Sequence, residues 1–308
     1  MTSKPAALCI FGPTGSGKTS LAIALAQQFN GCIINADSRQ VYQHISTLAA
    51  CPSAAEYAAA PHKCFEFLDP NHTYSAGQYV TDAGQAAAAA TAAGQLPIFC
   101  GGTGFYLQCL MAGLSPIPDV PAELVAAYQA QWQADPAGTF AELEAVDPAW
   151  AAAIAPQDMQ RTVRGLSVYA HTGRLFSDWQ NELRTGGLPY RFICLGLTHP
   201  RDILHARLAT RVEDMLAAGL LTEVQALRAA GYSLDAPGLS SIAARHFYAY
   251  LDNDISLDEA KERFLIGHRQ YAKRQEAWLR HHYPADVVFS SPTVEAVVGW
   301  VEKVFHEG

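Results

Sequence analysis

The residues best suited to chemistry stand near the N-terminus, in the run Gly12-Pro13-Thr14-Gly15-Ser16-Gly17-Lys18-Thr19. This run matches the pattern G-x-x-x-x-G-K-[ST] in full. Its glycines let the backbone turn so that successive N–H groups point toward one anion. Lys18 supplies a mobile cation for phosphate oxygens, and the hydroxyl of Thr19 is suited to ligate Mg²⁺. The run therefore predicts a phosphate-binding loop with Mg²⁺ as cofactor, and it leaves the phosphate compound open.

The segments on either side of the loop suit this interpretation. The apolar run 6–11 predicts a buried strand, and 20–26 predicts the first turns of a helix. Strand, glycine loop and helix form the arrangement in which the pattern binds phosphate. The helix N-terminus adds unpaired N–H groups and the positive end of its dipole.

Strand-like and helical segments then alternate along the chain. This alternation predicts a P-loop NTPase-like α/β fold, with a parallel sheet flanked by helices. In such sheets the site lies beyond the carboxyl ends of the strands, so we expect Asp37 and Thr103 to meet the glycine loop there. The further strands are expected at 31–35, within 61–70, and at 96–100, 191–197 and 286–289; the longer helices are expected at 79–93, 105–111, 201–228 and 257–282.

A different pattern occupies the middle of the chain. A proline-rich connection at 116–121 precedes a helical stretch, 122–185, which proline residues interrupt and which holds no strand-like run. We therefore predict a catalytic core formed by residues 1–118 and 188–308. A helical insertion domain is expected at 119–187.

Two polar residues follow predicted strands and have more than one interpretation. Asp37 could ligate Mg²⁺ or accept a proton, and it could equally cap the next helix. Thr103 lies in the turn Gly101-Gly102-Thr103-Gly104, which could offer N–H groups and a hydroxyl to an anion, or serve only as a turn. The residues alone leave both pairs of alternatives open.

Arginines recur at helical spacing in three places. Arg207 and Arg211 share one helix face and suit a diphosphate, although nearby carboxylates could pair with them. Arg161 and Arg164 lie three residues apart in the insertion. A third group, including Arg269, Lys273 and Arg274, lies on the helix at 257–282. Local basic clusters of this kind bind an RNA backbone, and the alternative is a solvated helix surface.

Composition narrows the possible classes of protein further. The chain has 308 residues and a net charge of −8, which by itself argues against a nucleic-acid partner. None of the seven cysteines forms a C-x-x-C pair, so we expect buried thiols in a reducing compartment. No apolar run is long enough to span a membrane, and residues 1–5 do not resemble a secretory signal. We expect a cytoplasmic monomer without GTPase or zinc-binding motifs.

Five segments in this order resemble the bacterial tRNA isopentenyltransferase family, the tRNA dimethylallyltransferases. The resemblance runs from about residue 6 to 282 and rests on several motifs taken together. They are Gly12–Thr19, the run Asp37-Ser38-Arg39-Gln40-Val41-Tyr42, Leu68-Asp69-Pro70 with Tyr74-Ser75-Ala76, Gly101-Gly102-Thr103-Gly104-Phe105-Tyr106-Leu107, and Arg269-Gln270-Tyr271-Ala272-Lys273-Arg274-Gln275.

The resemblance implies transfer of a dimethylallyl group from dimethylallyl diphosphate to N6 of adenosine 37 in tRNA. It implies that the loop from Gly12 to Thr19 holds the diphosphate leaving group, with Mg²⁺ and Arg207 nearby. Neutralising charge on the leaving group lowers the barrier to its departure. Asp37 matches the carboxylate that accepts the proton from N6, and the remaining catalytic residues implied are Thr103, Lys18 and Arg211.

The resemblance also implies contacts with the anticodon arm of tRNA. The residues that match such contacts are Asp37, Ser38, Arg39, Gln40, Gln160, Arg161, Thr162, Val163, Arg164, Arg245, Arg269, Lys273 and Arg274. Two segments depart from the family pattern. The family usually has G-T-A-K-P where this chain has Leu48-Ala49-Ala50-Cys51-Pro52, and G-Y-R where it has Ala243-Ala244-Arg245.

Three alternatives remain at this point. The loop and the parallel sheet fit a small-molecule kinase that binds ATP equally well. An isopentenyltransferase acting on free adenine nucleotide is a second alternative, against which the arginines of the insertion argue. The third is an RNA- or nucleotide-binding module without catalysis.

Overall fold

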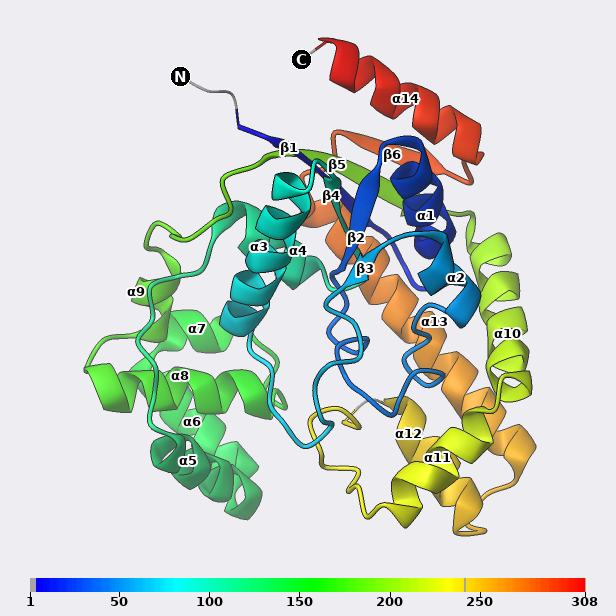
Figure 1. The fold of residues 1–308 in the computed structure, drawn as a ribbon. Coiled ribbons are helices and arrows are strands. Elements are labelled where there is room, and N and C mark those ends of the chain that lie inside the picture. The colour runs from blue at the N-terminus through cyan, green and yellow to red at the C-terminus, as the bar shows by residue number, and fades with distance from the viewer. Residues whose placement is uncertain (1–3, 241, 308) are drawn as a thin grey trace. The chain divides into compact units, whose positions relative to one another are not determined.

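The computed structural model describes residues 4–240 and 242–307. The chain divides into two compact units, one formed by 4–111 with 188–307 and the other by Ala112–Gly187. The first unit is built on a six-stranded sheet in the order β3-β2-β4-β1-β5-β6 (Figure 1). Every neighbouring pair is parallel. Its strands are β1 (Ala6–Phe11), β2 (Gly31–Asn35), β3 (His62–Lys63), β4 (Leu96–Gly101), β5 (Arg191–Thr198) and β6 (Val287–Ser290).

The central strands are continuous apolar runs because both faces of the sheet are covered. On one face β1, β2, β4 and β5 pack against α1 and α14, with Leu8, Ile98 and Leu195 in the shared core. On the other face they pack against α3, α4 and the C-terminal part of α13. These helices are α1 (Lys18–Gln28), α3 (Ala76–Ala92), α4 (Gly104–Ala112), α13 (Leu257–His281) and α14 (Val294–Glu307).

A further helical group packs beyond the carboxyl ends of the strands. Val212, Val224, Phe247 and Phe264 come from four different helices and share one apolar core with residues 41–48. This core fixes the positions of the helices that carry the arginine and glutamine side chains of the candidate active site. The group consists of α10 (Arg201–Ala217), α11 (Leu220–Ala229), α12 (Ile242–Leu251) and part of α13, and the short helix α2 (Ala54–Ala59) precedes β3.

The α/β fold class predicted from the sequence is confirmed, with two corrections. The strand expected within 61–70 is only the two-residue β3, because the chain turns away at Cys64, whose φ is 64°. The helix expected at 201–228 is two helices, separated at Gly219, whose φ is 97°. An L-residue in that left-handed conformation is unfavourable, so the glycine marks the break.

The second unit is helical, with a small core of its own around Trp132, Leu143 and Leu166. The predicted insertion at 119–187 lies within this unit, which begins at Ala112. Leu114 and Thr185 pair through two backbone hydrogen bonds of 2.9 Å, which join the entering and leaving chain segments. Its helices are α5 (Ala122–Ala134), α6 (Pro136–Val146), α7 (Pro148–Ala152), α8 (Met159–Thr172) and α9 (Phe176–Gln180).

None of the seven cysteines, all of which lie in the described residues, forms a disulfide bond, and five of them are buried. Within the described residues, no helix combines the length and the apolar character that a membrane span requires.

Gly101 at the end of β4 is required by the close approach of the backbone that follows β2. A Cβ atom at this position would lie 2.1 Å from the carbonyl carbon and oxygen of Ala36. We expect Gly101→Ala to lower the free energy of unfolding by about 2 kcal/mol or more, because the backbone must shift to admit the methyl group. Urea unfolding followed by circular dichroism measures this change. Gly299→Ala is the control, since a Cβ there meets nothing within 4 Å and α14 should be stabilised slightly; equal losses would contradict the prediction.

Candidate active site

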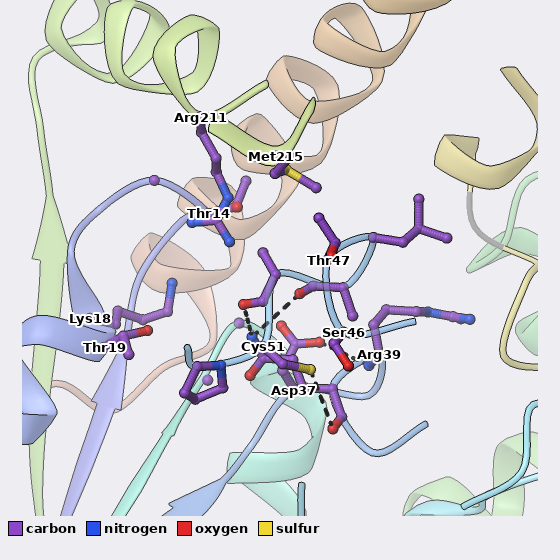
Figure 2. A pocket seen from close by; sticks show the side chains of 18 of the residues that line it. Thr14, Lys18, Thr19, Asp37, Arg39, Ser46, Thr47, Cys51, Arg211 and Met215 are labelled. Atoms are coloured by element: carbon purple, nitrogen blue, oxygen red, sulfur yellow. Dashed lines mark hydrogen bonds between the residues drawn. The ribbon is translucent and has the colours of Figure 1, made fainter. Parts of the chain in front are cut away.

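The glycine loop follows β1 directly and ends where α1 begins, at Lys18. The Lys18 Nζ donates to the carbonyls of Gly12 and Pro13, at 2.8 Å each, so the ammonium lies against the start of the loop. Thr19 is partly exposed at the wall of a cavity of about 1310 Å³. Lys18, Thr19, Arg211 and Asp37 all border this cavity, as Figure 2 shows.

Side chains from other elements fix the backbone of the loop. Arg207 on α10 donates from Nε to the carbonyl of Gly15 at 2.7 Å. His199, just after β5, donates from Nε2 to the carbonyl of Ser16 at 3.0 Å, and its Nδ1 lies 2.7 Å from the Ser291 hydroxyl. Arg207 therefore holds the loop through Nε, and its Nη2 lies beside Gly17.

Two cations, those of Lys18 and Arg211, border the cavity. Neither Lys18 nor Arg211 is ion-paired to a carboxylate in the described part of the chain. Arg211 Nε is buried and makes no hydrogen bond with the described residues. Burial lowers the pKa of Lys18 to about 8, against the opposing fields of Cys100 and Asp37. Burial also lowers the pKa of Arg211. A buried cation without a partner is costly, so this arrangement suits an anionic ligand.

Asp37 is held by one oxygen and leaves the other available. Its Oδ1 accepts the N–H of Arg39 at 2.9 Å, and its own N–H donates to Asn35 at 2.8 Å. Its Oδ2 has no hydrogen-bond partner among the described residues and lies near Gly102. Asp37 caps a turn, and no helix begins there, so the helix-capping alternative is wrong.

Thr103 joins the two turns that follow β2 and β4. Its Oγ1 accepts the N–H of Ser38 at 2.9 Å and donates to the Ser38 hydroxyl at 3.2 Å. The structure therefore brings the glycine loop, Asp37 and Thr103 to the same edge of the sheet, as the strand order requires.

Gln275 on α13 is a site residue that sequence reasoning missed. Only 4% of it is exposed. Its Oε1 accepts the N–H of Thr14, and its Nε2 donates to the carbonyl of Gly102, both at 2.8 Å. The available signal was a glutamine on the apolar stripe that includes Ala272 and Leu279. Tyr271 lies one turn earlier, with its hydroxyl 3.5 Å from the same carbonyl.

The residues matched to tRNA contacts in the first unit fall into two groups. Arg39 donates to the carbonyl of Pro237 at 2.7 Å, and Gln40 donates to that of Ala50 at 2.7 Å, so both hold neighbouring segments. The other group lies on helices, where Arg245, Lys273 and Arg274 are exposed and Arg269 is partly buried. Arg274 also stands over the Tyr271 ring, 5.7 Å from its centre.

In the second unit, the matched residues lie on two sides of α8. Gln160 and Arg161 are exposed, and Arg161 is ion-paired with Asp158 at 3.3 Å. Arg164 is half-buried, and burial lowers its pKa. Thr162 and Val163 are buried, with Val163 in the core of the unit, so their side chains do not form part of an exposed contact surface.

The segment that departs from the family pattern at 48–52 is well fixed. Glu223 on α11 accepts the N–H groups of Thr47 and Leu48, at 2.7 and 2.8 Å. Cys51 borders the cavity, and burial raises its pKa, so the thiol is uncharged. In the second departing segment, Ala244 is buried and Arg245 is exposed; the side chain of Ala243 lies outside the described residues.

The parallel sheet, the glycine loop after β1 and the cavity beyond the strand ends define an α/β protein of the P-loop NTPase-like class. The model of the IPP transferase family matches residues 40–282, and this chain belongs to that family. A tRNA dimethylallyltransferase of Nitratidesulfovibrio vulgaris strain DP4 is 40% identical over 277 residues, covering 90% of this chain and 89% of the relative. One from Stenotrophomonas maltophilia strain K279a is 42% identical over 290 residues, with 90% of each chain covered.

Solved structures agree with this assignment. The full-length tRNA isopentenylpyrophosphate transferase from Bacillus halodurans superposes with a TM-score of 0.72 at 27% identity, covering 99% of this chain and 96% of that one. A eukaryotic dimethylallyltransferase acting on tRNA gives a TM-score of 0.79 at 27% identity, covering 94% of this chain and 75% of the other.

Proposed function

We propose that this chain transfers the dimethylallyl group of dimethylallyl diphosphate to N6 of adenosine 37 in tRNA and releases diphosphate. One observation carries the proposal. Lys18 and Arg211 have no acidic ion-pair partner among the described residues, and they border the same cavity as Asp37, whose Oδ2 accepts no hydrogen bond from those residues. The family and its curated relatives support tRNA prenylation over the kinase and nucleotide alternatives.

The reaction divides between the two ends of this cavity. At one end the bond between the allylic carbon and the diphosphate oxygen breaks, and Lys18, Arg211 and the N–H groups of the loop stabilise the departing charge. At the other end N6 forms a bond to the same carbon and its proton passes to Asp37. The adenine must leave the base stack to reach this carbon. Thr103 keeps the turn at Ser38 beside Asp37.

Mg²⁺ is part of the proposal. The Thr19 hydroxyl offers one hard oxygen at the loop, and magnesium commonly binds through few protein ligands with substrate phosphates completing its shell. Bound there, it would neutralise diphosphate charge.

The proposed tRNA surface is narrower than the sequence suggested. In the second unit it rests on Gln160, Arg161 and Arg164, and in the first on the exposed cations of α12 and α13. We also propose that the chain acts on its tRNA substrate as a monomer in the cytoplasm.

The direct test supplies the purified chain with dimethylallyl diphosphate, Mg²⁺ and unmodified tRNA bearing A36-A37-A38. Mass spectrometry of the digested nucleosides should show prenylated adenosine. Parallel reactions with ATP alone and with free adenine nucleotide test the two enzymatic alternatives. Tight tRNA binding without product from any donor would favour a binding module and reject the proposal.

Lys273 tests the tRNA surface of α13. We expect Lys273→Ala to flatten the dependence of log affinity on log salt by about 0.7–0.9, because one phosphate contact is lost. Filter binding of unmodified tRNA across a salt series measures this slope. Lys303→Ala removes the same charge from the exposed face of α14 and should leave the slope unchanged. Equal slopes for wild type and Lys273→Ala would exclude this contact.

A further inference from the structure

We infer that Gln275 restricts the glycine loop to diphosphates by closing the end at which a third phosphate would bind. This inference rests on the proposed function, since it explains why a loop of this sequence would take a diphosphate donor. It begins from a contact that the loop pattern does not require. The Oε1 of Gln275 accepts the N–H of Thr14, within the loop itself.

The carboxamide of Gln275 is locked in one orientation. Its Nε2 donates to the Gly102 carbonyl at 2.8 Å while its Oε1 accepts from Thr14 at 2.8 Å. Rotating the amide by half a turn would set a donor against the Thr14 N–H and an acceptor against the Gly102 carbonyl. A Cβ on Gly102 would lie 2.2 Å from Nε2, so the glycine provides the space that the carboxamide fills. With 4% exposure, the side chain is a fixed part of the cavity wall.

This contact shortens the set of N–H groups that the loop offers to an anion. Pro13 has no N–H group, and the Ser16 N–H donates to the Pro13 carbonyl at 3.1 Å. The Thr14 N–H is used by Gln275. From Pro13 to Thr19, the N–H groups that have no partner among the described residues lie on Gly15, Gly17, Lys18 and Thr19, toward the helix end of the loop.

The closed end is the one that an outer phosphate would occupy. In loops of this pattern the backbone N–H groups hold the α- and β-phosphates, and the lysine reaches outward to the β- and γ-phosphates. Lys18 Nζ lies against the carbonyls of Gly12 and Pro13, which marks the start of the loop as the outer end. There a third phosphate would meet the acceptor oxygen of Gln275 in place of a free N–H. A phosphate oxygen and a carboxamide oxygen are both acceptors, so their contact disfavours the ligand that carries the third phosphate.

The test compares two inorganic anions, pyrophosphate and tripolyphosphate, by calorimetry with Mg²⁺ and the full chain. We expect wild type to bind pyrophosphate about tenfold more tightly or better, and Gln275→Ala to bring the two affinities within about threefold. Gln225→Ala removes an exposed glutamine from α11 and should keep the wild-type ratio. Equal affinities in wild type, or an unchanged ratio in Gln275→Ala, would overturn the inference.

A second variant covers the case in which Gln275→Ala does not fold. Gln275→Asn withdraws the carboxamide from Thr14 with less loss of volume, and it should likewise bring the affinities for pyrophosphate and tripolyphosphate within about threefold. Neither probe carries a prenyl group, so the two proposals fail separately. A chain that prenylates tRNA but binds both anions equally refutes only the role of Gln275; one that discriminates but makes no product refutes only the proposed function.

Discussion

Asp37→Asn is expected to reduce the single-turnover rate of prenyl transfer by about 10²–10⁴-fold, with little change in affinity for dimethylallyl diphosphate. The asparagine oxygen must remain at Oδ1 to accept the Arg39 N–H, so its NH₂ group takes the place of Oδ2. An NH₂ group in that place accepts neither a hydrogen bond nor a proton from N6. Quenched-flow assays with excess enzyme measure the rate, and calorimetry with pyrophosphate measures donor binding.

Asp69→Asn provides a matched control for this substitution. Asp69 also accepts a backbone N–H two residues ahead, from Asn71 at 2.8 Å, and it does not border the cavity. The same change of charge in the same kind of turn should therefore leave the rate near wild type. A rate undiminished in Asp37→Asn would remove Asp37 as the proton acceptor.

Much of the fold was predictable because its signals are local. The continuous apolar runs of β1, β2, β4 and β5 and the glycine loop are each read from a few neighbouring residues. The errors arose where the backbone turns on single residues. Cys64 leaves β3 after two residues, with a φ of 64°, and Gly219 divides one expected helix into two.

Strand topology could predict only the site residues that directly follow a parallel strand. Asp37 and Thr103 each follow a parallel strand, so the sheet itself brings them to the glycine loop. Gln275 reaches Thr14 across 261 residues of sequence, and no local pattern determines that pairing. His199 presents the same difficulty, since its partner Ser16 lies 183 residues away. Helical periodicity could have excluded Thr162 and Val163, which a linear motif cannot separate from their exposed neighbours.

Lys18→Met is expected to lower kcat/KM for prenyl transfer by about 10²–10³-fold, because the leaving group loses a preorganised cation of the loop. Methionine retains an unbranched side chain and removes the charge. Initial rates at varied donor concentration measure the effect, with Lys303→Met on exposed α14 as the control. A loss of less than about tenfold would place the lysine outside the diphosphate site.

Measuring the pyrophosphate affinity of wild type and Lys18→Met as a function of pH isolates the contribution of the Lys18 charge. Because its pKa is lowered from 10.5 to about 8 in the folded chain, the amine becomes neutral as pH rises through 8. We expect the advantage of wild type over Lys18→Met in pyrophosphate affinity to be constant at low pH and to shrink above pH 8. The ionisation of the ligand is common to both titrations and cancels in their ratio.

The free energy of unfolding should follow the opposite trend with pH. Between the folded pKa of about 8 and the unfolded value of 10.5, the unfolded chain binds more protons at Lys18 than the folded chain does. The free energy of unfolding of wild type, relative to Lys18→Met, should therefore rise with pH across that window. Urea unfolding of both proteins through this range measures it. If Lys18 binds the anion at a cost in stability, the wild-type advantage in pyrophosphate affinity falls with pH while its relative free energy of unfolding rises. If Lys18 only stabilises the loop, both quantities should fall with pH.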